Sequence, residues 1–262
     1  MTPYRLDLTV SALRRLSTNV VDVLTADGQY VHAFDGAHGP VVARVSQARP
    51  DALAVTIEAD AGEHARVLAL VRRTLGVDRD LTHFERAAAR LPWLRPLARR
   101  VRGVKPPRYR TLWEAFVNAI IFQQVSLYAA SAIARRLITA LGTPLEHEGT
   151  PLYAFPSIEH VVGAADRELR ATGLSAGKIG ALRRAGEALV AGELDEAMLE
   201  ARSSPEAVTL LRRIKGIGPW TATVILLRGL GRLDVFPMND TSVARNLALV
   251  AGDVPLDVGS LL

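Results

Sequence analysis

The 262-residue chain contains no cysteine. This absence excludes disulfides, thiolate catalysis, iron–sulfur clusters and cysteine-ligated zinc. Aromatic residues make up only 5% of the chain, and no apolar run approaches the length of a membrane-spanning helix. The first ten residues lack a basic segment followed by an apolar stretch, so we expect no secretory signal. These features favour a cytoplasmic protein without membrane contacts.

Ligand-binding motifs are also scarce. The six histidines are scattered without the spacing of metal ligands, and no Walker or dinucleotide-binding glycine motif occurs. We therefore expect neither a catalytic metal nor an organic cofactor.

Acidic residues are missing from two stretches of a chain whose net charge is +5. Every charge between Glu85 and Glu114 is basic, and so is every charge between Glu206 and Asp234. Basic stretches of this kind indicate a surface that faces a polyanion. A solvated arginine-rich face is an equally good interpretation of the charge pattern alone.

Hydrophobic periodicity predicts an α+β fold. Period-two patterns predict antiparallel strands over 4–10, 23–34, 41–45 and 53–57, with Asp27-Gly28 as a hairpin turn. Helical spacing begins at Gly62 and continues to Leu75. We expect a small N-terminal antiparallel-sheet α/β module over residues 1–80. A mostly α-helical domain should follow over residues 81–262.

The second domain reads almost wholly as helices. We expect a strongly apolar helical region over 112–137, with a break near Gln123-Gln124, and further helices over 157–172 and 178–190. Ser204-Pro205 is typical of a helix start, because serine caps and proline fits the first turn.

A glycine turn joins two helices within residues 205–230. Gly216 and Gly218 allow a close backbone approach, and Pro219 suits the first turn of the second helix. The free amides of that turn, with the helix dipole behind them, can bind an anion beside Lys215. An ordinary tight turn between helices explains two glycines as well.

The complete string IKGIGPWTA, residues 214–222, is more specific. With EAFVNAIIFQQVS (residues 114–126), Phe155-Pro156 and Gly173-Leu174-Ser175, it resembles the helix-hairpin-helix DNA glycosylase superfamily. Within that superfamily the chain is most similar to the 3-methyladenine DNA glycosylase II branch, whose extra N-terminal module the strand-rich first eighty residues match. Proteins of that family usually continue through another helix or two that help to close the base pocket, whereas this sequence stops at Leu262 within a helical pattern. Either the chain is naturally short or its C-terminal part is missing from this sequence.

The resemblance places the family's catalytic aspartate at Asp240. Cleavage of an N-glycosidic bond builds positive charge on the sugar, which a carboxylate can stabilise. Asp240 can also serve as the N-cap of the helix that follows. Asp234, six residues earlier, is expected to be structural.

Trp220 stands where strand-cutting members carry a Schiff-base lysine. The resemblance therefore implies a monofunctional enzyme that removes the base and leaves an abasic site. Trp220 can line the base pocket or belong to the core. Val224 replaces a pocket aromatic of the branch, which weakens stacking on cationic purines.

The resemblance also implies the residues that contact DNA. Gln124 takes the position of the wedge that fills the gap left by an extruded base, although both glutamines can instead satisfy buried helix ends. Tyr128 and Trp113 are expected in the core. The predicted DNA-binding residues are Lys215, Gly216, Ile217, Gly218, Thr221, Gln123, Gln124 and Ser126. A structural monovalent cation at the hairpin would be held by the carbonyls of Arg212, Ile214 and Gly216.

The favoured hypothesis is a monomeric base-excision-repair glycosylase that flips and hydrolytically removes alkylated purines from double-stranded DNA. It would act in the cytoplasm, on the nucleoid. One alternative is a bifunctional glycosylase and abasic-site lyase for oxidised bases. Another is a non-catalytic helix-hairpin-helix DNA-binding protein.

Overall fold

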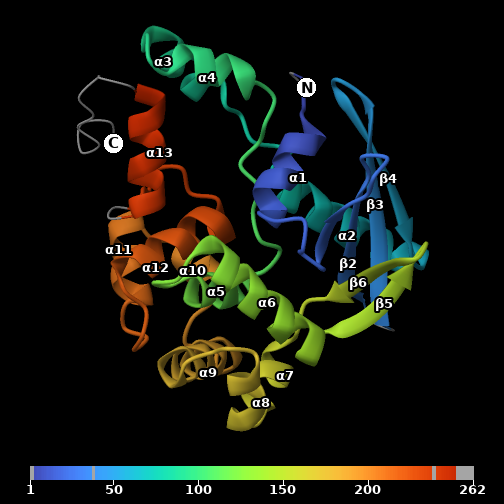
Figure 1. Cartoon of the computed structure of the whole chain (residues 1–262), viewed down its shortest axis with the longest axis vertical. Coiled ribbons are helices and arrows are strands. Elements are labelled where there is room, and N and C mark those ends of the chain that lie inside the picture. The colour runs from blue at the N-terminus through green and yellow to red at the C-terminus, as the bar shows by residue number, and fades with distance from the viewer. Residues whose placement is uncertain (1–2, 37–38, 238–239, 252–262) are drawn as a thin grey trace.

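The computed structural model describes residues 3–36, 39–237 and 240–251. A four-stranded sheet and its helices form the N-terminal part, and a helical layer follows (Figure 1). The helices are α1 (Leu6–Arg14), α2 (Ala61–Leu75), α3 (Thr82–Arg90), α4 (Arg95–Arg100), α5 (Leu112–Ile121), α6 (Leu127–Leu141), α7 (Ile158–Gly163), α8 (Asp166–Ala171), α9 (Ala176–Val190), α10 (Glu196–Glu200), α11 (Ser204–Leu211), α12 (Pro219–Ile225), the π-helical turn η1 (Leu226–Leu230) and α13 (Thr241–Ala251).

The N-terminal sheet is an antiparallel meander. Its strands lie in the order β1 (Asp22–Leu24), β2 (Tyr30–Gly36), β3 (Gly39–Arg49) and β4 (Ala52–Glu58). Gly28, at φ +84°, forms the turn between β1 and β2, as the Asp27-Gly28 pair predicts. The sheet and α2 confirm the predicted α+β fold. The boundary near residue 80 stays a prediction.

The segment Tyr4–Val10 is not a strand, and this prediction was wrong. It contributes to α1, which buries Leu6, Val10 and Leu13 against the sheet and α2. The spacing of these three positions is helical, but it becomes evident only when Leu13, beyond the predicted strand, is included. A seven-residue window fits both periods, whereas the next turn fits only the helix.

The helical domain contains a hairpin that the sequence did not reveal. Strands β5 (Thr143–His147) and β6 (Thr150–Ala154) pair in antiparallel register around the two-residue turn Glu148-Gly149. Leu152 and Ala154 pack against Val31 and Ala33 of β2, so the hairpin covers one face of the sheet (Figure 1). Pro144 and Pro151 argued against strands in the sequence, because within sheets proline is confined largely to edge strands.

Helix boundaries differ in two further places. The predicted helix over 157–172 is two helices, because Ala164 and Ala165 are extended between α7 and α8. The cap of α11 is Ser203, whose hydroxyl and backbone amide both contact the Glu206 carboxylate. Ser204 is the first helical residue instead.

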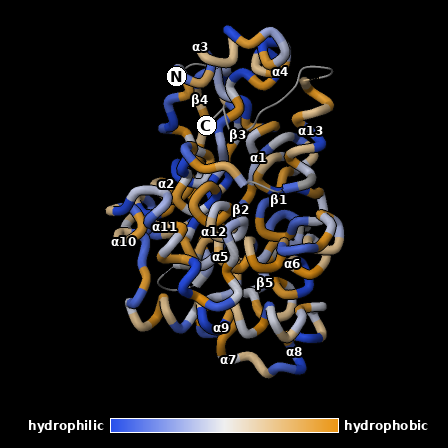
Figure 2. Tube along the Cα trace, turned by 90° about the vertical axis from the view of Figure 1, so that its left-hand side faces the viewer, coloured by the Kyte–Doolittle hydropathy of each residue, from blue (hydrophilic) through white to orange (hydrophobic). Residues whose placement is uncertain are grey.

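Helix α5 is the centre of the helical core. Ala115, Phe116, Ile120 and their neighbours on α5 are buried, and α12 and α9 pack against this helix. Figures 1 and 2 both show α12 beside α5. The predicted break is confirmed, since α5 ends at Ile121 and α6 begins at Leu127. The loop between them therefore projects from a rigid pair of helices.

Two arginines connect the N-terminal part to the end of the α12–η1 helix. Arg73 of α2 and Arg108 each donate to the carbonyl oxygen of Gly229 at 2.9 Å, and both pair with Glu196. Burial and the positive charge of Arg73 lower the pKa of Arg108 to about 10. Cations at a helix C-terminus are stabilised by its dipole.

A buried polar cluster joins the sheet to α5. Asp22 accepts hydrogen bonds from Tyr30 (2.8 Å) and the His32 Nδ1 (2.9 Å). Arg110 pairs with Glu114 at 3.0 Å and donates to the carbonyl of Ala33 at 2.9 Å. This cluster ties β1 and β2 to the start of the helix that carries the Gln123-Gln124 loop.

Candidate nucleic-acid interface and active site

The Gly216–Gly218 turn has the backbone that its glycines predict. Gly216 lies at φ +105°, and a Cβ there would approach the Ala181 Cβ to 2.7 Å. Gly218 is the N-cap of α12, at φ −85°, and a Cβ there would meet nothing within 4 Å. Gly216 is therefore required by packing, whereas Gly218 leaves the helix N-terminus open to an approaching group.

Two side chains from distant helices hold this turn. Arg184 of α9 donates to the carbonyl of Lys215 at 2.9 Å. Gln123 donates to the carbonyl of Gly216 at 2.9 Å and to the Thr221 hydroxyl at 2.8 Å. The predicted wedge loop and the predicted phosphate-binding turn are thus joined by one amide group.

The Gln123 bonds bear on two other predictions. The Thr221 hydroxyl is buried against Gln123, which leaves the backbone amide for the predicted contact with DNA. The Gly216 carbonyl already accepts from Gln123, and the Ile214 carbonyl accepts from the amide of Ile217. The cation site at Arg212, Ile214 and Gly216 stays a prediction.

Asp240 is held at the start of α13. Its Oδ1 accepts from the backbone amides of Ser242 (2.9 Å) and Val243 (3.1 Å). Its Oδ2 accepts from the indole Nε1 of Trp220 at 3.0 Å. The carboxylate is half-buried, and three donors fix its orientation. The capping role is observed, and the catalytic role stays a prediction.

Trp220 is therefore more than a residue of the core. It is half-buried at the start of α12, and its indole reaches across to the loop that carries Asp240. Val224, one helical turn later, is buried. Their predicted contact with the extruded base remains to be tested. Asp234 accepts from the Ser204 hydroxyl at 2.7 Å, the structural role that was expected.

The loop between α5 and α6 is exposed and strained. Gln124 lies at φ +54°, a left-handed conformation that non-glycine residues seldom adopt. Its side chain is exposed, as is that of Ser126, which caps α6 by accepting from the amide of Ala129. Strain in an exposed loop is characteristic of functional sites. The wedge role of Gln124 stays a prediction.

The expectation for the two nearby aromatics was half right. Trp113 is buried and donates to the carbonyl of Pro156 at 3.1 Å. Tyr128 was wrongly placed in the core, because 74% of its side-chain surface is exposed. Apolar neighbours in the sequence suggested burial, but the first turn of α6 extends beyond the core.

The basic stretches divide into inward and outward residues. Lys105, Arg108 and Arg110 are buried or half-buried against backbone carbonyls and carboxylates. Outward residues that form no ion pair within the described parts of the chain are Arg86, Arg90, Arg95, Arg99, Arg100 and Arg102 on α3–α4 and the turn after it, and Arg212, Arg213 and Lys215 at the hairpin. A polyanion-facing surface is thus limited to these outward residues.

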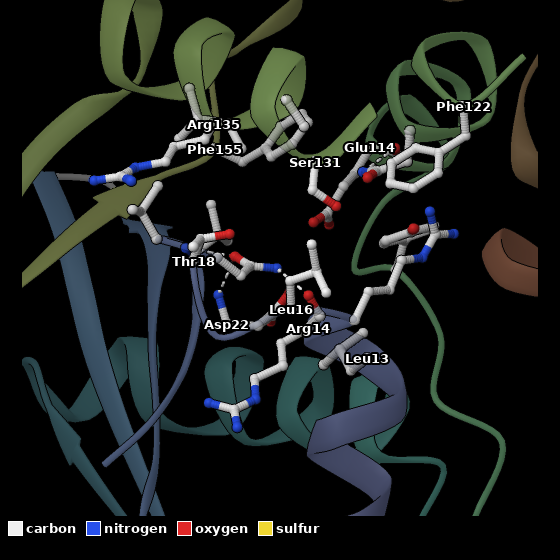
Figure 3. A pocket seen from close by; sticks show the side chains of 18 residues that line it. Leu13, Arg14, Leu16, Thr18, Asp22, Glu114, Phe122, Ser131, Arg135 and Phe155 are labelled. Atoms are coloured by element: carbon white, nitrogen blue, oxygen red, sulfur yellow. Dashed lines mark hydrogen bonds between the residues drawn. The ribbon is translucent and has the colours of Figure 1, made fainter. Parts of the chain in front are cut away.

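A small cavity of about 40 Å³ lies between the loop after α1 and helices α5 and α6. Leu16 and Asp22 face Glu114 and Phe122 across it (Figure 3). The guanidinium of Arg15 lies 3.8 Å from the centre of the Phe122 ring. Neither Trp220 nor Asp240 lines this cavity. The cavity therefore lies outside the predicted site.

Sequence reasoning missed three supporting side chains. Lys178 of α9 donates to the carbonyl of Ile121 at 2.7 Å, and burial lowers the pKa of this lysine. It thereby satisfies the end of α5 beneath the loop. Arg184 donates to the carbonyl of Lys215 in the hairpin, and Arg15 stacks on Phe122 at the start of the loop. Lys178 begins the helix expected over 178–190, but no pattern in the sequence signals its partner or the partners of the two arginines.

The described residues contain neither a metal-binding cluster nor a membrane-spanning helix. No group of three or more histidine, aspartate or glutamate side chains in those ranges could hold a metal ion. None of the helices described is long and apolar enough to span a bilayer.

A helix, a glycine hairpin, a second helix and a carboxylate at the next helix start, beside an N-terminal antiparallel sheet, define the fold class of the helix-hairpin-helix base-excision repair proteins. The chain belongs to the HhH-GPD superfamily of base excision DNA repair proteins, whose family model matches residues 117–252.

Individual relatives agree with this assignment. The chain is 36% identical over 195 residues to the probable bifunctional transcriptional activator/DNA repair enzyme AlkA of Mycobacterium tuberculosis. The matched region covers 72% of this chain and 38% of the relative. The chain therefore spans well under half the length of that protein.

Solved structures show the same fold. The 3-methyladenine DNA glycosylase of Archaeoglobus fulgidus superposes with a TM-score of 0.82 at 24% identity, covering 97% of this chain and 86% of the other. The Schizosaccharomyces pombe 3-methyladenine DNA glycosylase in complex with abasic DNA gives 0.54 at 27% identity, with coverages of 68% and 85%.

Proposed function

We propose that this protein is a monofunctional DNA glycosylase that removes alkylated purines, of the 3-methyladenine and 7-methylguanine type, from duplex DNA. The hydrogen bond from Trp220 to Asp240 carries this proposal. This bond fixes a carboxylate beside the hairpin. Its donor, Trp220, occupies the position of the lysine of strand-cutting members. The name of the similar Schizosaccharomyces pombe protein, a 3-methyladenine DNA glycosylase, supports the substrate class.

The chemistry follows from the charge that develops on the sugar. As the N-glycosidic bond breaks, the bonding electrons leave with the base and the deoxyribose becomes cationic. The Asp240 carboxylate stabilises that cation, and water adds at the anomeric carbon. The alkylated purine is cationic while it is attached, so it leaves as a neutral base with the bonding electrons, and the added water releases one proton to solvent. The product is an abasic site in an intact strand.

Lysine usage favours hydrolysis over strand cleavage. The chain contains three lysines: Lys105, Lys178 and Lys215. Lys105 and Lys178 donate to the carbonyls of Arg79 and Ile121 respectively, and Lys215 is exposed ahead of the hairpin glycines. A Schiff base needs a free amine at the sugar, whereas we expect Lys215, which precedes the hairpin glycines, to face a phosphate. The bifunctional alternative is therefore less favoured.

The decisive experiment compares Asp240→Asn with the wild type in the release of 3-methyladenine and 7-methylguanine from alkylated duplex DNA. Removal of a key electrostatic group should lower the rate on the order of 10²–10³-fold. Asp234→Asn is the matched control, since its carboxylate lies six residues away and contacts Ser204. This control should stay within a few-fold of the wild type.

Other outcomes identify the alternatives. Equal rates for wild type and Asp240→Asn would remove Asp240 from the mechanism. A covalent adduct with an abasic duplex under borohydride would establish the lyase alternative. Salt-sensitive DNA binding without release of any alkylated base would establish the non-catalytic one.

The proposal includes a setting as well as a reaction. A repair glycosylase meets its substrate on chromosomal DNA, so we place its action in the cytoplasm at the nucleoid. The hairpin, Asp240 and the Gln123-Gln124 loop all come from one chain, which supports action as a monomer. Sedimentation of the protein with and without duplex DNA measures its oligomeric state.

A further inference from the structure

An exposed apolar tip lies beside the Gln123-Gln124 loop. It consists of Val125, Leu127 and Tyr128, which are 39%, 43% and 74% exposed. Eight large apolar residues are exposed in the described part of the chain, and three of them fall within residues 125–128. Scattered exposed apolar residues need no explanation, but a cluster marks an interaction site.

The apolar tip is mounted rigidly. Ser126 caps α6, and further along this helix Ala130 and Leu137 are fully buried in the core. On the other side, Gln123 is bonded to the hairpin. The exposed side chains therefore have little freedom to fold back onto the protein, and their exposure is built into the fold.

We propose that the apolar tip inserts into the duplex at the lesion and that Tyr128 stacks on the base left without a partner in the opposite strand. This inference rests on the proposed function, because an orphaned base exists only when its partner has been extruded. Gln124 is the predicted plug for the vacated position. A glutamine amide offers little stacking surface, whereas the phenol of Tyr128 offers a full aromatic face.

The chemistry of the duplex favours this occupant. Base faces become accessible where a pair has been opened, and aromatic side chains stack on any base without sequence preference. A tyrosine combines an apolar ring with a polar edge, which suits a groove that is apolar inside and wet at its rim. The tip is also adjacent to Gln123, which is bonded to the hairpin predicted to bind the DNA backbone.

The test uses a duplex with a stable abasic-site analogue and the fluorescent base 2-aminopurine in the opposite strand. Wild type and Tyr128→Phe should quench the fluorescence, because both retain an aromatic ring that can stack. Tyr128→Ala should leave it bright and weaken binding by about 5- to 150-fold, the range expected for loss of one base–aromatic stack. All variants should melt at the wild-type temperature, since the ring is exposed.

Leu68→Ala is the matched control. Leu68 is 40% exposed on α2, a helix that packs on the N-terminal sheet and carries none of the residues predicted to contact DNA. This variant should quench and bind like the wild type. If Leu68→Ala lost as much affinity as Tyr128→Ala, the effect would reflect general surface hydrophobicity, and the inference would fall.

The inference and the proposed function fail separately. Wild-type quenching and affinity in Tyr128→Ala would overturn the stacking role, whatever the rate of base release. Loss of self-association in Tyr128→Ala with unchanged DNA binding would assign the tip to a second copy of the chain instead. Absence of base release by the wild type would overturn the proposed function alone, because the abasic duplex already contains the orphaned base.

Discussion

At the scale of single residues, the bond between Trp220 and Asp240 changes the meaning of both positions. The sequence offered pocket or core for Trp220, and catalysis or capping for Asp240. The structure shows one carboxylate with two functions divided between its oxygens, since Oδ1 caps α13 and Oδ2 accepts from the indole. A carboxylate held in this way cannot rotate without losing these bonds.

Trp220→Phe should therefore slow base release while leaving the aromatic ring in place. Hydrogen bonds to charged groups contribute about 1.5–3 kcal/mol, so the expected loss in single-turnover rate is roughly 10- to 100-fold. Trp113→Phe loses an equivalent indole bond, to Pro156, away from Asp240. It should lower the melting temperature but keep the rate. A wild-type rate in Trp220→Phe would show that Asp240 needs no orientation by the indole.

At the scale of elements, the two glycines of the hairpin should respond differently to the same change. Gly216→Ala combines a positive φ with a contact to Ala181 at 2.7 Å, so it should destabilise the fold by about 1–3 kcal/mol. Gly218→Ala, in open space and at negative φ, should cost under about 1 kcal/mol.

Denaturant unfolding measures the stability loss of each variant. Binding to duplex DNA measures a separate effect that we expect for Gly218→Ala. The methyl group of Gly218→Ala stands at the helix N-terminus where a phosphate would approach, so affinity should fall while stability is retained. Equal stability losses in the two variants would contradict the geometry of the turn.

Elements also show how far the sequence predicts this structure. Long periodic segments such as α2, and turns with strong signals such as Asp27-Gly28, were predicted correctly because local sequence determines them. Helix α1 was taken for a strand because its decisive apolar residue, Leu13, lies outside the short window. The β5–β6 hairpin depends on packing against β2, a contact far away in sequence.

The same contrast applies to the site. The hairpin glycines and Asp240 are marked by their motif, whereas the partners of Gln123, Arg184 and Lys178 exist only in the folded chain. Tyr128 was misjudged for a related reason, because apolar character in a sequence does not reveal which helix turn extends past the core.

At the scale of the whole molecule, the buried cluster between sheet and helices should make stability depend on pH. Burial, with the positive charge of Arg110, lowers the pKa of His32. Protonation would place an N–H at Nε2, which has no hydrogen-bond partner among the described residues. The unfolded state binds that proton near pH 6.5, so stability is full above this pH and is lost as the pH falls below it.

Asp22 acts in the same direction at lower pH. Burial alone would raise its pKa, but the hydrogen bond and charge of His32 with the charge of Arg110 outweigh burial and keep the pKa below its usual value. Its contribution is present above about pH 3.9 and is lost below it.

Melting temperatures between pH 7.5 and 5 measure the histidine effect. The wild type should lose stability on acidification, and His32→Gln should lose less, although it starts from a lower value. His160→Gln, at an exposed position of α7, should follow the wild type. Parallel curves for wild type and His32→Gln would show that the cluster does not control the acid response.

The amide of Gln123 has a consequence for the DNA itself. Because it joins the hairpin to the loop that carries Gln124, it fixes the separation between the predicted phosphate-binding turn and the predicted wedge. With both roles as predicted, we expect the duplex to supply the movement by bending until a base pair meets the loop. Bending and opening cost least where pairing or stacking is already weakened. Damage would then be detected first as a locally deformable site in the double helix, before the altered base enters a pocket.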